Sequence, residues 1–290
     1  MALQIQTFKT RTLTSIVFVL IMLCGLFINY WTFFILFSII HFGCWFEYKK
    51  IAGKIVADYN SISPVHFLFA LFAGWGYMMW MANSAFTIAQ IKLSEAGWYL
   101  MLISLIALPV TEIVLSKNFY LKPLLLSLVG LLYISFSCGC MIDLRSEGMI
   151  FGNFFGIDLG LILPLLVIAT IWINDTMAYI VGSLIGKTKM SSVSPKKTWE
   201  GTIGGILLAV TTITILGYIF FKADVQQLII IAVIACVAGI CGDLFESKLK
   251  RLAGVKDSGN ALPGHGGFLD RFDSMLFATI FVWLYVKIFL

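Results

Sequence analysis

Residues 159–184 read LGLILPLLVIATIWINDTMAYIVGSL, and this nearly unbroken apolar run decides the fold class. A helix that crosses the hydrocarbon core of a bilayer needs about 17 to 25 residues of this kind. The apolar residues are continuous rather than alternating, which favours a membrane helix over a strand of a membrane barrel. Asp175 is the single charged residue in the run.

Similar runs fill most of the 290-residue chain, which is 60% hydrophobic and 12% charged. Soluble domains carry about 25% charged residues, so the composition excludes a cytosolic globular enzyme, a disordered chain and a fibrous protein. The stretch from Thr12 to Phe46 is too long for one crossing, so we expect a hairpin that turns at Asn29 and Tyr30. Since backbone groups find no water inside a bilayer, each run should be a helix. The nine predicted spans are 12–28, 31–46, 65–83, 96–115, 122–142, 159–184, 202–221, 225–243 and 272–290.

The distribution of Lys and Arg predicts the orientation of these spans. Nine spans would place 16 of the 20 Lys and Arg residues on one side of the membrane and four on the other. Basic residues accumulate on the cytoplasmic side. We therefore expect an all-α, polytopic transmembrane bundle with a cytoplasmic N-terminus and a C-terminus outside. The net charge of +5 needs no nucleic-acid partner, because cytoplasmic loops that face anionic lipid account for it.

Charge also divides the chain into two regions. Residues 1–150 are predicted to be an N-terminal transmembrane scaffold, and residues 151–290 a C-terminal catalytic region with cytoplasmic loops 185–201 and 244–271. Residues 174–274 hold eight of the 15 acids and ten of the 20 bases. In the first region, Glu112 lies near the end of an apolar run, and we expect its carboxylate to snorkel to the interface. We expect His41 and His66, at span ends, to be structural.

The first charged cluster extends from Asn174 to Gly201. An ionisable residue within an apolar segment costs a few kcal/mol, so Asp175 favours a functional interpretation. Asp175, Tyr179, Gly182 and Gly186 fall on one face of a helix, although close packing between helices is an alternative role for the glycines. The lysines and hydroxyl residues that follow suit a polyphosphate ligand. An ordinary cytoplasmic loop would have the same composition.

The second cluster, residues 242–274, is rich in carboxylates. Such a set without His or Cys partners suits hard cations such as Mg²⁺. The sequence PGHGG at 263–267 precedes the last span, where glycines allow close approach and a helix N-terminus favours anions. His265 is a candidate phosphate donor or proton carrier. The two clusters together predict phosphoryl or nucleotidyl transfer with Mg²⁺ at the cytoplasmic face. The five carboxylates of the second cluster are those of Asp243, Glu246, Asp257, Asp270 and Asp273.

These motifs resemble those of the phosphatidate cytidylyltransferase, or CDP-diacylglycerol synthase, family. They cover about a third of the chain, and the first 150 residues carry none of them. In the second cluster the matching residues are Ser247, Leu249 to Arg251, Lys256, Asp257, Pro263 to Gly267, Asp270, Arg271 and Asp273. In the first they are Asn174 to Thr176, Ala178, Tyr179, Gly182, Gly186, Lys187 and Ser194 to Gly201.

The resemblance implies that CTP and phosphatidate react to give CDP-diacylglycerol and pyrophosphate. It implies that Asp243 and Asp270 hold the metal, with Asp257 and Asp273 as second choices. Mg²⁺ and Mn²⁺ both prefer carboxylate oxygens, so Mn²⁺ is an alternative, and a second, monovalent cation near the same acids is a further expectation. The implied catalytic residues are Asp243, Asp270, Lys256, His265 and Arg271. The implied substrate-binding residues are Asn174, Asp175, Lys187, Ser194, Lys196, Lys197, Thr198, Arg251, Gly266 and Gly267.

The resemblance also implies a homodimer. The short N-terminus favours a bacterial inner membrane protein, and the distribution of basic residues predicts that the active site faces the cytoplasm. Two rival functions remain at this point. A CTP-dependent prenol kinase shares parts of the architecture. A secondary transporter would also carry an intramembrane acid such as Asp175, but its charges would lie at the midplane rather than on one side.

Overall fold

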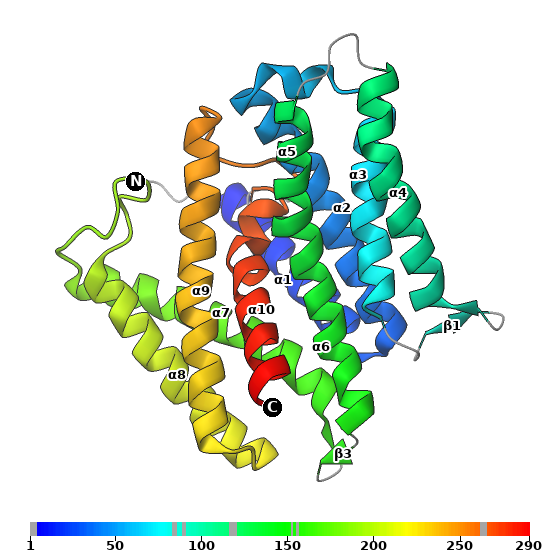
Figure 1. Ribbon diagram of the computed structural model, residues 1–290. Helices are drawn as coiled ribbons and strands as arrows, with labels where there is room; N and C mark the ends of the chain where they lie inside the picture. Colours follow the sequence, from blue (N-terminus) through cyan, green and yellow to red (C-terminus); the bar gives the residue numbers. More distant parts are fainter. Residues whose placement is uncertain are drawn as a thin grey trace. The chain divides into compact units, whose positions relative to one another are not determined.

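The structure is a computed structural model that describes residues 5–82, 86–88, 91–115, 121–151, 153–154, 157–261 and 266–290. Helices dominate it, and two short antiparallel hairpins pair β1 (Thr87–Ile88) with β2 (Ile91–Lys92) and β3 (Asn153–Phe154) with β4 (Ile157–Asp158) (Figure 1). The helices are α1 (Ile5–Phe27), α2 (Tyr30–Ile55), α3 (Pro64–Trp80), α4 (Leu93–Leu115), α5 (Leu121–Gly130), α6 (Ser137–Phe151), α7 (Leu159–Ile185), α8 (Trp199–Phe221), α9 (Val225–Leu252) and α10 (Leu269–Phe289). A 3₁₀ turn spans Ala57–Ser61, and a π-helical segment, Leu131–Phe136, joins α5 to α6.

The all-α prediction is confirmed. When α5, the π-helical segment and α6 are counted as one, the described residues form nine helices, one at each predicted span. Seven of the helices in this part of the chain are long and apolar enough to cross a membrane, and α1 and α3 are the two that do not meet this measure. The protein is therefore an integral membrane protein with seven candidate spans, whereas the orientation of its termini stays a prediction.

The predicted break between the first two spans lies where expected. Helix α1 ends at Phe27 and α2 begins at Tyr30. The Asn29 side chain accepts a hydrogen bond from the backbone N–H of Thr32, and the Thr32 hydroxyl accepts one from the backbone N–H of Asn29. This reciprocal capping box satisfies amides that would otherwise be unpaired at the start of α2, which explains why a weak polar signal is enough to end one helix and begin another.

The chain forms two compact units. The first contains residues 1–146 and 252–272, and the second contains residues 147–251 and 273–290. Large aromatic side chains of α2, among them Trp45 and Tyr48, are fully buried in the first unit. The predicted division into an N-terminal scaffold and a C-terminal catalytic region stays a prediction.

A polar network lies inside the first unit. His66 Nδ1 is 2.8 Å from Glu112 Oε2, and His66 Nε2 is 2.9 Å from the Ser127 hydroxyl, which lies 3.2 Å from the Tyr59 hydroxyl. Glu112 is only 2% exposed, so the expectation that its carboxylate snorkels to the interface is wrong. A hydrogen bond with the His66 imidazole stabilises the Glu112 carboxylate better than partial contact with water at the membrane interface would. The predicted structural role of His66 agrees with this arrangement.

We expect His66→Ala to lower the free energy of unfolding by about 3 kcal/mol, because it leaves a buried carboxylate without its partner. Ser38→Ala is the matched control, since Ser38 accepts one neutral hydrogen bond from Trp75 Nε1 at 3.0 Å, worth about 1 kcal/mol. Unfolding in detergent measures both variants. Equal losses would contradict the role of His66 as the partner of the buried Glu112 carboxylate.

In the second unit, α7 and α8 approach each other through small residues. A Cβ atom on Gly205 would lie 2.7 Å from the Ala178 Cβ and 2.8 Å from the Asn174 carbonyl oxygen. A Cβ on Gly201 would lie 2.7 Å from the Ala178 carbonyl oxygen. Small residues let membrane helices come this close. Close packing therefore accounts for Gly201 of the first charged cluster and for Gly205, which follows the cluster, and the same approach brings Asn174 of α7 toward the start of α8.

Gly205→Ala is expected to destabilise the protein by about 1 to 3 kcal/mol, because the added methyl group must push α7 away from α8. Gly239→Ala makes the same chemical change in α9, where the nearest atoms would lie 3.6 Å from the new Cβ. Thermal unfolding of the two variants in one detergent tests the difference. A Gly239→Ala variant that loses as much stability as Gly205→Ala would contradict this account of the α7–α8 contact.

Candidate active site

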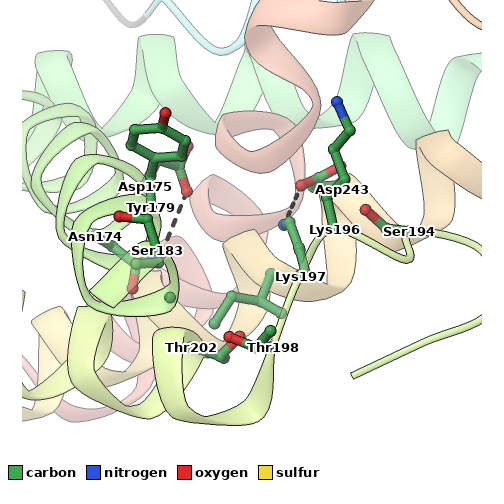
Figure 2. A pocket seen from close by; sticks show the side chains of 13 residues that line it. Asn174, Asp175, Tyr179, Ser183, Ser194, Lys196, Lys197, Thr198, Thr202 and Asp243 are labelled. Carbon is green, nitrogen blue, oxygen red and sulfur yellow. Dashed lines mark hydrogen bonds and ion pairs between the residues drawn. The ribbon is translucent and has the colours of Figure 1, made fainter. Parts of the chain in front are cut away.

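A pocket of about 430 Å³ opens in the second unit between α7, the segment before α8, and α9 (Figure 2). Its volume lies within the range of about 300 to 1,000 Å³ that is usual for small-molecule sites. Polar side chains from separate parts of the sequence meet there. Its lining is formed by Asn174, Asp175, Ala178, Tyr179, Gly182, Ser183, Ser194, Lys196, Lys197, Thr198, Thr202, Ile240 and Asp243.

The backbone of the segment between α7 and α8 explains how lysines are held at the pocket. The Met190 N–H donates to the Lys197 carbonyl at 2.9 Å, and the Lys197 N–H donates to the Ser194 carbonyl at 3.1 Å. Thr198 caps α8 by accepting a hydrogen bond from the Gly201 N–H. Glu200, in the first turn of α8, accepts hydrogen bonds from the backbone N–H groups of Lys187 and Thr188. These bonds fold the segment back onto the start of α8.

Opposite charges meet across the pocket. Figure 2 shows the Lys197 ammonium paired with the Asp243 carboxylate of α9. The Ser247 hydroxyl donates to Asp243 Oδ1 at 3.2 Å from the next turn of the same helix. Lys196 and Ser194 also line the pocket. The cluster thus combines cationic groups that can bind an anion with an acid that can bind a cation.

The α7 side of the pocket carries an amide beside an acid. The Asn174 amide nitrogen donates to Asp175 Oδ1 at 3.3 Å. Asn174 is 3% exposed, and within the described residues its Oδ1 has no hydrogen-bond partner. A buried acceptor without a partner is costly, and a ligand or an ordered water that donates a hydrogen bond to it would remove this cost.

The second unit also contains acids outside the pocket lining. Glu246 forms an ion pair with Lys250, one turn further along α9. Asp273, in the first turns of α10, is close enough to Asp175, Asp243 and Glu246 to be repelled by their charges. A cation would relieve this repulsion, and an all-carboxylate donor set suits Mg²⁺. Across the ranges that the structure describes, however, no three His, Cys, Asp or Glu side chains are arranged to hold a metal ion.

Other predicted site residues lie in the first unit, at the start of α10 and in the segment before it. The Asp270 carboxylate accepts hydrogen bonds from the Ser258 N–H at 2.9 Å and the Gly267 N–H at 2.8 Å. Gly266 has φ = +86°, and a Cβ there would lie 2.6 Å from Asp270 Oδ2, so glycine is required. Lys256, Asp257 and Arg271 are exposed residues of this unit. His265 lies outside the described residues.

Lys187 and Arg251 belong to the second unit, and both are exposed but absent from the pocket lining. The sequence interpretation did not select Ser183, Thr202 or Ile240 for this site. Ser183 and Thr202 look like ordinary hydroxyls in membrane helices, which bond their own backbone. The one available signal is the i to i+4 spacing of Tyr179 and Ser183, which places these two residues on the same face of a helix.

Comparisons with known proteins identify the family of the chain. A model of the cytidylyltransferase family matches residues 9–289, nearly the whole chain. The chain belongs to the cytidylyltransferase family. This membership confirms the resemblance inferred from the motifs, and the match includes residues 9–150, where no motif was found.

Several relatives of this cytidylyltransferase family member are phosphatidate cytidylyltransferases. One from Staphylococcus haemolyticus is 43% identical over 141 residues, which are 48% of this chain and 54% of the relative. One from Bacillus subtilis is 46% identical over 121 residues, 41% of this chain and 45% of the relative. A chloroplastic enzyme from Arabidopsis thaliana is 39% identical over 129 residues, 44% of this chain and 33% of the relative. The chain spans about half the length of the two bacterial relatives.

Proposed function

We propose that this protein transfers the cytidylyl group of CTP to phosphatidate, giving CDP-diacylglycerol and pyrophosphate. The observation that carries the proposal is the pocket in the second unit, where Lys196, Lys197 and Asp243 meet Asn174 and Asp175. Its lysines match a polyphosphate, and its position among apolar helices suits an enzyme whose second substrate is a lipid. Family membership and the names of the relatives support the same reaction.

In the proposed reaction, an oxygen of the phosphatidate phosphate attacks the α-phosphorus of CTP. A new P–O bond forms, the bond from the α-phosphorus to its bridging oxygen breaks, and pyrophosphate leaves with the bridging oxygen. A phosphate oxygen is already nucleophilic near neutral pH, so the residues mainly position the substrates and neutralise charge. Lys196 and Lys197 would bind the triphosphate, and their charges would stabilise the leaving pyrophosphate.

Asn174 is proposed to recognise the cytosine base. Its buried Oδ1 has no partner within the described part of the chain, and it can accept a hydrogen bond from the exocyclic amino group of cytosine. A uracil base presents a carbonyl at that position and would leave the same oxygen unsatisfied. Such a site rejects the wrong base because its buried polar atom stays unpaired.

Mg²⁺ is the proposed metal, and Mn²⁺ is the alternative. The proposal also includes a second, monovalent cation near the same acids. Asp243 and Asp270 would hold it, and Asp257 and Asp273 are the further candidate ligands. A bound Mg²⁺ would neutralise the phosphate oxygens. Lys197 forms an ion pair with Asp243, and on nucleotide binding the same ammonium can turn to the triphosphate.

The proposed active site faces the cytoplasm of a bacterial inner membrane, where CTP is available. The bacterial relatives and the distribution of basic residues support this location. One contact within the first unit is consistent with this proposal. Glu47 lies near the end of α2 that is predicted to be cytoplasmic, and it bonds Ser258 of a loop that is also predicted to be cytoplasmic. A homodimer remains a proposal from the family resemblance. The prenol kinase and the transporter remain the alternative functions.

An assay with purified protein in phosphatidate vesicles and Mg²⁺ tests the proposal. With CTP labelled in its cytidine, the label should enter the lipid fraction while an equal amount of pyrophosphate is released. A prenol kinase would transfer the γ-phosphate to a prenol and release CDP. Transport of an ion across liposomes without CTP, combined with no labelled lipid, would overturn the proposal.

A further inference from the structure

Glu47 is a buried acid in the part of the chain that carries no family motif. It lies in α2 and is only 4% exposed. Its neighbours in the sequence, Phe46 and Tyr48, are aromatic. A carboxylate in such surroundings is costly unless other groups donate hydrogen bonds to it. Its partners therefore indicate why an acid is present at this position.

The partners of Glu47 lie more than 200 positions away in the sequence, around the segment between α9 and α10. The Ser258 hydroxyl donates to Glu47 Oε2 at 2.7 Å, and the Leu269 N–H donates to the same oxygen at 3.0 Å. A Cβ added to Gly259 or Gly267 would collide with the Glu47 carboxylate. Backbone on both sides of the carboxylate thus closes around it, and all of these residues belong to the first unit.

Ser258 connects Glu47 to Asp270. While its hydroxyl donates to Glu47, its backbone N–H donates to Asp270 Oδ2 at 2.9 Å. The Asp270 N–H in turn donates to the Ser258 hydroxyl at 3.3 Å. The carboxylates of Glu47 and Asp270 therefore share one serine, and Leu269, which Glu47 also bonds, immediately precedes Asp270.

We propose that Glu47 is a positioning residue for cytidylyl transfer, which fixes the start of α10 and the orientation of the Asp270 carboxylate. The inference rests on the proposed function, in which Asp270 holds the metal. Residues that hold metal ligands in place typically contribute about 10- to 100-fold to metal affinity or activity. The N-terminal half would then supply a residue, Glu47, that affects the reaction by holding Asp270 of the family motif in place.

The test uses the full-length protein and the variants Glu47→Gln and Ser258→Ala. Both should lower kcat by about tenfold or more and change the KM for CTP by less than about threefold, because neither residue lines the nucleotide pocket. Hydrogen exchange of the Ser258 and Gly267 amides, measured without metal or substrate, should accelerate in Glu47→Gln by at least about tenfold, since the structure that holds these amides loosens. The double variant should lose little more activity than either single variant.

Glu112→Gln is the matched control. Glu112 is also a buried glutamate of the first unit, but it bonds His66. Its substitution should leave the exchange of the Ser258 and Gly267 amides and the kcat within about twofold of wild type. If Glu47→Gln does not fold, Ser258→Ala decides, because it removes only one hydroxyl.

Three results would overturn the inference. The first is wild-type kcat in both variants. The second is faster exchange without a loss of kcat, which would make Glu47 a purely structural residue. The third is an equal effect of Glu112→Gln. Failure of the proposed function would look different, since the wild-type protein would not transfer cytidylyl groups while the hydrogen-exchange results would be unaffected.

Discussion

Asp243→Asn is expected to lower kcat for CDP-diacylglycerol formation by at least about a thousandfold. The Asp243 carboxylate lies in the pocket, pairs with Lys197 and is a proposed ligand of Mg²⁺. The amide has nearly the same shape, but it carries no charge with which to bind a cation or to hold the lysine. Production of labelled lipid from labelled CTP measures the effect.

Asp224→Asn is the control for this substitution. Asp224 precedes α9, and its carboxylate accepts a hydrogen bond from the Gln226 N–H at the end of the helix away from Asp243. The variant should keep wild-type activity, and both variants should reach the membrane in equal amounts. Purified Asp243→Asn protein that turns over at the wild-type rate would remove Asp243 from the metal site.

Lys197→Met is expected to lower kcat/KM for CTP by about a hundredfold or more, because the triphosphate loses one of its positive contacts and Asp243 loses its cationic partner. Lys197→Arg should retain more activity, since the charge remains while the geometry changes. Steady-state kinetics with varied CTP measure both effects.

Lys222→Met provides the matched control, because Lys222 caps the other end of α8 and lies over the ring of Tyr218. It removes the same charge from the same unit, and the kinetic constants should not change. If Lys222→Met is as impaired as Lys197→Met, the loss would reflect general charge or stability rather than binding of the triphosphate.

The helices could be predicted from the sequence because the bilayer imposes one solution on a continuous apolar run. The break at Asn29 could likewise be predicted from the sequence, since the apolar stretch around it is too long for one span and Asn is a good helix cap. Glu112 was misinterpreted because the position of an acid near a span end does not reveal a histidine that lies 46 residues away in the sequence. Long-range pairing of this kind has no local signal.

In the candidate site, too, some residues have a local signal in the sequence and others do not. Lys196, Lys197 and Asp243 were identifiable because charge is rare in this chain, so each charged residue requires an explanation. Ser183 and Thr202 were not identifiable, because hydroxyls are common in membrane helices and only the packing of α7 against α8 brings them to the pocket. Glu47 directly follows a predicted span, where an acid is unremarkable until its contact with Ser258 is known.

The π-helical segment between α5 and α6 sets the rotational phase of two serines. Ser127 bonds His66 before it, and Ser135 bonds His41 and Trp45 within it. Positions eight apart on a regular α-helix point about 80° away from each other, since one turn takes about 3.6 residues. The wider π turn absorbs about one residue, which returns the two hydroxyls to nearly the same face. The segment thus corrects the helical phase. An uninterrupted α-helix with the same number of residues would leave the two hydroxyls about 80° apart, so only one of them could reach its histidine.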